Sequence, residues 1–115
     1  MVTKKGRISA PAGNLESVAQ DLCDTGFQVI IYGEASDPGV RSVLEWTYGN
    51  GIAMLNPEDD LEIRRRKIAL LSQSGQSEYS FADFASRFLA RNIGHIYELR
   101  LINAAHSDAE ERTRA

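Results

Sequence analysis

The sequence predicts a small three-layer α/β/α domain with a mainly parallel sheet, and two observations lead to that prediction. The first is a series of short apolar segments of strand length, at residues 27–32, 52–55 and 68–71. Residues 27–32 are β-branched or aromatic on both faces, which is typical of a strand covered on both sides. The second is that helical patterns alternate with these segments, as expected for βαβ units.

The bulk composition is that of one ordinary globular domain. The chain has 115 residues, of which 43% are hydrophobic and 25% charged. Its net charge of −3 offers no general attraction to nucleic acid or to an anionic membrane. We expect the domain to span residues 1–103, with a flexible or frayed tail at residues 104–115.

The number of cysteines and the first residues of the chain indicate the cellular compartment in which the protein is expected. Cys23 is the only cysteine, so the sequence contains neither an internal disulfide nor a cysteine zinc set. The basic first residues are not followed by a long apolar run, so we expect no signal peptide and no membrane span. A reducing cytoplasm is the expected location.

The first helix is predicted from apolar residues at helical spacing after Asn14, a good N-cap, and before Gly26, which can end a helix. These apolar residues are Leu15, Val18, Ala19, Leu22 and Cys23. Cys23 is therefore expected to be a small buried hydrophobic residue.

Two structures remain open for residues 38–48. Asp37 can cap a helix that begins at Pro38, Gly49 can end it, and the buried face would contain Val40, Val43, Leu44 and Thr47. The dipeptide at residues 50–51, Asn-Gly, is also a strong hairpin signal, which would make residues 42–48 a strand. The capping residue, the helical spacing of the apolar residues and the terminating glycine agree with one another, which favours the helix.

The second half predicts one more helix and a last strand. The charged connection after residue 55 can hold one or two helical turns, starting at Asn56 or Pro57. Ser80 with Asp83 three residues on resembles a capping box, and an apolar stripe follows at Phe81, Phe84, Ala85, Phe88 and Leu89. Residues 95–102 alternate enough for a strand. A further short strand is expected at Arg7–Ala10.

In order and pattern, the chain resembles the small PIN-like proteins of toxin–antitoxin systems over about residues 7–102. The segments that carry this resemblance are Asn14-Leu15, residues 26–30, Glu34 with Ser36-Asp37, residues 51–59, residues 67–71 and the helix at residues 80–91. The resemblance implies a PIN-like fold. In active members it also implies carboxylates that bind Mg²⁺ or Mn²⁺ and cleave RNA.

This sequence departs from the PIN-like pattern at two acids. The aspartate expected after the first strand falls at Ala12, and the first aspartate of the later motif falls at Pro57. Asp37 and Asp59 remain as the catalytic candidates. The metal candidates are Glu34, Asp37, Glu58, Asp59 and Asp60, because hard divalent cations take oxygen ligands. Acids in this position can also oppose the dipole of a helix start.

One basic run, Arg64, Arg65, Arg66 and Lys67, is the candidate for binding nucleic acid through phosphate contacts. Four acids just before it, Glu58, Asp59, Asp60 and Glu62, can instead offset its charge on a solvated surface.

These features together predict a degenerate PIN-like domain that acts as a non-catalytic regulatory or macromolecule-binding module, with a protein partner and a possible homodimer, and no membrane partner. No cofactor is expected in that case. The alternatives are a Mg²⁺- or Mn²⁺-dependent ribonuclease with rearranged acids, for which RNA is the partner, and a nucleic-acid-binding regulator that uses residues 64–67.

Overall fold

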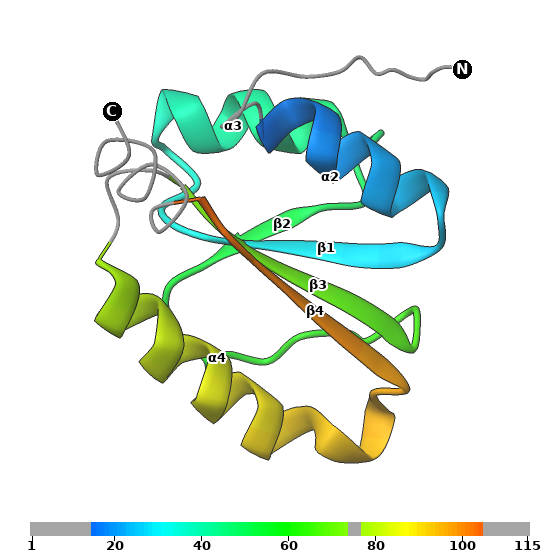
Figure 1. Ribbon diagram of the computed structural model, residues 1–115, viewed down its shortest axis with the longest axis vertical. Helices are drawn as coiled ribbons and strands as arrows, with labels where there is room; N and C mark the ends of the chain where they lie inside the picture. Colours follow the sequence, from blue (N-terminus) through cyan, green and yellow to red (C-terminus); the bar gives the residue numbers. More distant parts are fainter. Residues whose placement is uncertain (1–14, 74–76, 105–115) are drawn as a thin grey trace, which may run out of the picture.

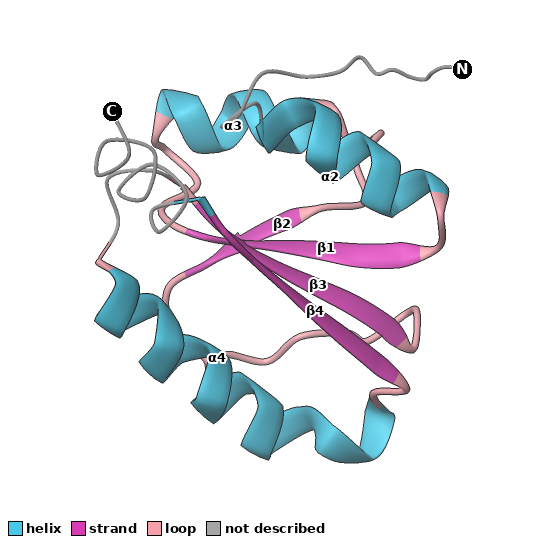
Figure 2. Ribbon diagram, viewed as in Figure 1, coloured by secondary structure: helices cyan, strands magenta, loops and turns pink. Residues whose placement is uncertain are grey.

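The computed structural model describes residues 15–73 and 77–104, which form a parallel sheet between two layers of helices (Figures 1 and 2). The strands are β1 (Phe27–Tyr32), β2 (Ile52–Met54), β3 (Lys67–Ser72) and β4 (Glu98–Asn103). The helices are α2 (Leu15–Asp24), α3 (Pro38–Glu45) and α4 (Glu78–Asn92), and a short 3₁₀ turn, η1 (Ile93–His95), follows α4. The predicted three-layer α/β/α architecture is confirmed.

The strand order in the sheet is β2-β1-β3-β4, and all three pairings are parallel. Helices α2 and α3 cover one face and α4 covers the other, as Figure 1 shows. Because β1 and β3 lie in the middle, their side chains are buried on both faces, which explains why their sequences are apolar without alternation.

Two apolar clusters hold the layers together, one on each face of the sheet. Under α2 and α3, the side chains of alternate strand residues such as Val29, Ile31 and Leu71 pack against Ala19 and Val43. Cys23 belongs to this cluster and is buried, as predicted. Under α4, the other strand residues pack against the phenylalanines of the helix; this cluster contains Ile30, Ile68, Leu70, Phe81, Phe84 and Phe88.

The structure decides between the two alternatives for residues 38–48 in favour of the helix. The Asp37 carboxylate accepts a hydrogen bond from the backbone N–H of Gly39, and Pro38 occupies the first turn. The side chain of Thr47 closes the other end, since its hydroxyl donates to the Leu44 carbonyl and accepts from the N–H of Gly51. The Asn-Gly pair at residues 50–51 therefore leads into β2 rather than forming a hairpin.

Two details of the second half differ from the prediction. Helix α4 is capped by Ser77, whose side chain accepts from the N–H of Ser80, so Ser80 is not the cap. Asp83 does not complete a capping box, because its carboxylate forms an ion pair with Arg87 one turn further on. No helix forms at residues 56–66. The expected strand at Arg7–Ala10, the cap at Asn14 and residues 105–115 of the expected tail lie outside the described residues.

The connection from β2 to β3 is irregular, although it passes β1 to reach the other side of that strand. Gln28, in the central strand and only 5% exposed, binds the end of this connection. Its amide nitrogen donates to the Glu62 carbonyl at 3.0 Å, and its amide oxygen accepts from the N–H groups of Arg64 and Arg65 at 2.8 and 3.1 Å. One side chain thus forms hydrogen bonds with three backbone groups. In a helical connection, such groups would have been hydrogen-bonded to the backbone of the helix itself.

We predict that Gln28→Leu lowers the free energy of unfolding by about 2–4 kcal/mol, because a similar volume is kept while three backbone groups lose their partners. Urea denaturation measures this loss. Gln20→Leu is the matched control, since Gln20 makes a single exposed hydrogen bond to Tyr48, and its cost is expected to stay within about 0.5 kcal/mol. Equal costs for the two variants would contradict the prediction.

Candidate functional site

The topology identifies one end of the sheet as the place for a ligand. From β1 the chain passes through α3 to β2 on one side, and from β3 it passes through α4 to β4 on the other side. The two connections diverge between β1 and β3, so the ends of these strands form a topological switch point. In open parallel sheets, ligands bind in the crevice outside the carboxyl ends of the strands at such a point.

On the α3 side of the switch point, Gln73 lies against the first turn of α3. Gln73 follows β3 directly and is half-buried. A Cβ atom at Gly39 would collide with the amide nitrogen of Gln73, so the glycine at this position permits the close approach. The Gln73 amide, the Asp37 carboxylate and the start of α3 together form a polar group at the carboxyl edge, which we call the switch-point cluster.

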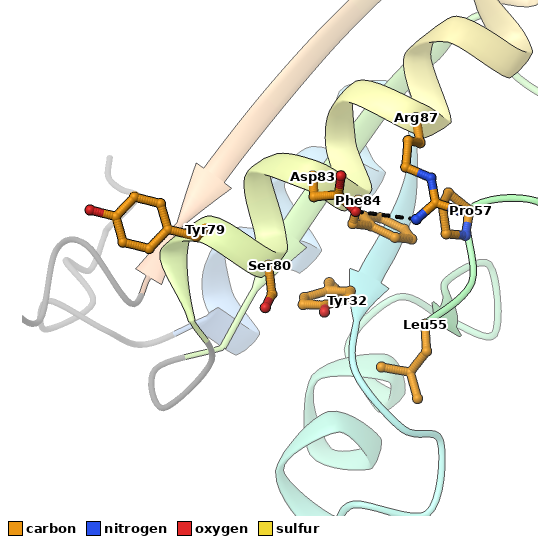
Figure 3. Close-up of a pocket in the computed structure, with 8 residues that line it drawn as sticks. All are labelled: Tyr32, Leu55, Pro57, Tyr79, Ser80, Asp83, Phe84 and Arg87. Atoms are coloured by element: carbon orange, nitrogen blue, oxygen red, sulfur yellow. Dashed lines mark hydrogen bonds and ion pairs between the residues drawn. The ribbon is translucent and has the colours of Figure 1, made fainter.

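On the α4 side, the same edge has a pocket of about 430 Å³ (Figure 3). Tyr32 at the end of β1 forms its floor, with its ring centroid 4.9 Å from that of Phe84 in α4. Leu55 and Pro57 line it from the chain after β2, and Ser80 from the first turn of α4. Its lining is therefore mixed, because the charged side chains of Asp83 and Arg87 line it together with the apolar ones. Figure 3 shows the side chain of Tyr79 directed away from the other lining residues.

Arg87 lies at the rim of this pocket between two carboxylates. It donates hydrogen bonds to Asp83 at 3.2 Å and to both carboxylate oxygens of Glu58. The hydrogen bond to Asp83, followed by the hydrogen bond and charge of Glu58, raises the pKa of Arg87 above its ordinary value. The guanidinium therefore stays charged, and the two carboxylates offset its charge.

The acids singled out in the sequence do not gather at one place. Asp37 caps α3, Glu58 binds Arg87, and Asp60 binds Arg91 at 3.1 Å. Glu34 and Asp59 are exposed. Across residues 15–73 and 77–104, no three His, Cys, Asp or Glu side chains gather closely enough to hold a metal ion. The predicted Mg²⁺ or Mn²⁺ site, and the catalytic roles of Asp37 and Asp59, stay predictions.

The basic run lies at the opposite, amino edge of the sheet and is largely used within the fold. Arg65 donates to the carbonyls of Cys23 and Phe27 at 3.1 and 2.9 Å, and Lys67 donates to the Thr25 carbonyl at 3.2 Å. Arg64 lies 3.7 Å from the carboxylate of Glu62. The side chain of Arg66 is exposed, and its carbonyl accepts hydrogen bonds from the N–H groups at the start of β4.

Sequence reasoning missed Gln73, Gly39 and Arg87. Gln73 falls in a segment whose polar composition indicates only an exposed turn, although its position directly after a buried strand is the signal that points to a ligand site. Gly39 lies inside a helix start, where nothing in the sequence shows which side chain approaches it. Arg87 is ordinary in the sequence, because its partner Glu58 is far away along the chain.

Comparison with known proteins gives a consistent set of relatives. The chain is 34% identical over 99 residues to 4-hydroxy-3-methylbut-2-enyl diphosphate reductase of Dehalococcoides mccartyi, a match that covers 84% of this chain and 35% of that protein. The protein with the same name in Wolinella succinogenes is 25% identical over 100 residues, covering 86% of this chain and 36% of the relative. No protein-family model matches the chain.

A solved structure agrees at the level of the fold. It is described as (E)-4-hydroxy-3-methyl-but-2-enyl diphosphate reductase, the terminal enzyme of the non-mevalonate pathway. It superposes with a TM-score of 0.56 at 20% identity, over 83% of this chain and 34% of the other. The chain therefore spans about a third of the length of the relatives it matches.

These relatives overturn the PIN-like identification. The resemblance to toxin–antitoxin proteins is wrong, and so are the two functions derived from it, a degenerate regulatory or protein-binding module and a ribonuclease. The relatives equally contradict the third predicted function, a nucleic-acid-binding regulator that uses residues 64–67. The physical reason is that an alternation of helices and parallel strands is common to many three-layer folds. The acidic stretch at residues 58–60, which suggested the family motif, forms ion pairs with α4 through Glu58 and Asp60.

Among the described residues, no helix combines the length and the apolar character required to cross a membrane.

We predict that Gly39→Ala displaces the Gln73 side chain from the start of α3. The unfolding free energy should change by less than about 1 kcal/mol, because alanine favours the helix and the amide is the flexible end of its side chain. The side-chain amide resonances of Gln73 measure the displacement by NMR, with those of Gln20 as the internal control. Unchanged Gln73 resonances would show that the two residues are not in contact.

Proposed function

We propose that this chain is a substrate-binding domain of a reductase that acts on 4-hydroxy-3-methylbut-2-enyl diphosphate or a closely similar allylic diphosphate. The observation that supports this most strongly is the 34% identity over 99 residues to a protein of that name. The common fold over 83% of this chain adds to it. Because the chain spans about a third of these relatives, it carries out this reaction together with further polypeptide.

The switch-point cluster is the part of the domain best suited to the polar end of such a substrate. Helices α3 and α4 both begin at the carboxyl edge, and a helix start favours an anion because its N–H groups point outward and its dipole is positive there. The Gln73 amide is a neutral donor beside the start of α3. The Asp37 carboxylate works against an anion, because it already accepts a hydrogen bond from the N–H of Gly39 at the start of α3.

The neighbouring pocket is suited to the carbon chain of the substrate. A five-carbon allylic unit is small compared with a cavity of about 430 Å³, and Tyr32, Leu55 and Phe84 offer it an apolar lining. The hydroxyl groups of Tyr32 and Ser80 provide partners for an alcohol group. Apolar side chains beside a few polar groups are typical of small-molecule sites, and here the charged side chains of Asp83 and Arg87 line the same pocket.

Binding is tested by titration calorimetry of the purified chain with 4-hydroxy-3-methylbut-2-enyl diphosphate, with inorganic pyrophosphate and with the alcohol that lacks the diphosphate. We expect heat of binding with the full substrate and a much weaker signal with either part. Gln73→Ala should weaken binding by about tenfold or more, since a hydrogen bond to a charged group contributes about 1.5–3 kcal/mol. Gln20→Ala, in α2, should bind as the unaltered chain does.

The assignment to a reductase is tested with a chimera. The matched 99 residues of the Dehalococcoides mccartyi protein are replaced by the corresponding residues of this chain, and folding is checked by circular dichroism before substrate binding and turnover are measured. We expect a folded chimera that binds the substrate and loses that binding on Gln73→Ala. A chimera that folds as the parent does and yet fails to bind would refute the proposal.

A further inference from the structure

The outer edge of β4 is a surface that the proposed function does not use. β4 is the last strand in the sheet order and is paired on one side only, with β3, among the described residues. An unpaired strand edge offers a row of backbone donors and acceptors to another strand. Figure 1 shows β4 in orange, with α4 on one side of the sheet and α2 and α3 on the other.

The direction of the backbone groups follows from the pairing with β3. The N–H groups of Tyr97 and Glu98 both donate to the Arg66 carbonyl, at 2.7 and 3.2 Å, so the regular alternation of β4 begins at Glu98. The backbone groups of Glu98, Arg100 and Ile102 therefore point toward β3. Those of Leu99 and Leu101 point outward, where a further strand can pair with them.

We propose that two copies of this chain associate through their β4 strands, paired antiparallel about a two-fold axis at Leu99. In this register Leu99 lies opposite its own copy, Glu98 lies opposite Arg100, and Tyr97 lies opposite Leu101. The contact is isologous, because each copy presents the same strand to the other.

Charge complementarity selects this register. On the face of the sheet that includes Phe27, Arg100 lies 4.5 Å from the Phe27 ring centroid and 3.3 Å from the Glu98 carboxylate of the same strand. In the dimer each Arg100 gains the Glu98 of the other copy as a direct cross-strand neighbour. An axis at Glu98 or at Arg100 would instead place identical charges opposite each other, and an axis between residues would place a charge opposite a leucine.

The other face of the strand supports the same pairing. Tyr97 and Leu101 are large apolar side chains with exposed fractions of 79% and 52%. Leu101 shares a face with Leu99, which packs under α4, and Tyr97 directly precedes the strand. In the proposed register each Leu101 lies opposite the chain at Tyr97 of the second copy, so the dimer brings these two exposed side chains together.

Sedimentation velocity of the full chain over a range of concentrations tests the proposal, with the expected result a monomer–dimer equilibrium. Arg100→Glu should shift it toward monomer, because two carboxylate–carboxylate pairs across the dimer axis would replace the two attractive ones. The exchange Glu98→Arg with Arg100→Glu in one chain should restore the dimer. A monomer at all concentrations, or an exchange variant that behaves like the single variant, would overturn the proposal.

A second variant separates association from folding. Leu101→Pro removes an outward N–H that β3 does not use, so the fold is expected to persist, as checked by circular dichroism, while the dimer is lost. Tyr79→Ser is the control, since Tyr79 is an 86% exposed aromatic on α4, and it should dimerise as the unaltered chain does. A Leu101→Pro chain that is folded and still dimeric would place the contact elsewhere and overturn the proposal.

Discussion

The hydrogen bonds of Gln28 are the constraint on which the arrangement of this domain depends. β2 and β3 are parallel and lie on either side of β1, so the chain between them must return across the sheet, and it does so without forming a helix. Leu61 and Ile63 of this connection contribute apolar contacts under α4. Its backbone, however, needs partners where it meets the buried start of β3. The Gln28 side chain in β1 supplies them through three hydrogen bonds, which offset the cost of burying its amide.

The order of the strands also determines where a ligand can bind. With β2 on one side of β1 and β3 on the other, α3 and α4 must cover opposite faces, because both crossover connections are right-handed. Both helices then begin at the carboxyl edge of the sheet, on opposite faces, and the Gln73 amide lies against Gly39 in the first turn of α3. The site is thus a consequence of strand order, and its polar groups come from two segments that are far apart in the sequence, Asp37 with the start of α3, and Gln73.

Local sequence patterns were enough to predict the helices and strands but not to identify the related proteins. The strands at residues 27–32 and 68–71 and the helix after Asp37 follow from local patterns, because buried strands and capped helices impose their composition over short stretches. The cap at Ser77 was missed because Ser80 with Asp83 has the same pattern, and only the ion pair of Asp83 with Arg87 distinguishes the two. The switch-point cluster could not be predicted, because it depends on which strands are neighbours. Sequence order alone does not determine that.

The acids after β2 explain why a pattern-level resemblance led to the wrong family. A cluster of carboxylates outside a strand end is expected both for a metal-dependent nuclease and for a connection that needs to be tethered to a neighbouring helix. Glu58 binds Arg87 and Asp60 binds Arg91, one helical turn apart on α4, so this cluster follows the helix rather than converging on one point. Exposed ion pairs of this kind contribute little individually, about 0–1 kcal/mol, but two of them in register align an otherwise irregular connection along α4. Carboxylates that follow a strand can therefore attach a connection to a neighbouring helix through ion pairs. They indicate a catalytic or metal site only when the structure shows that they converge on one point.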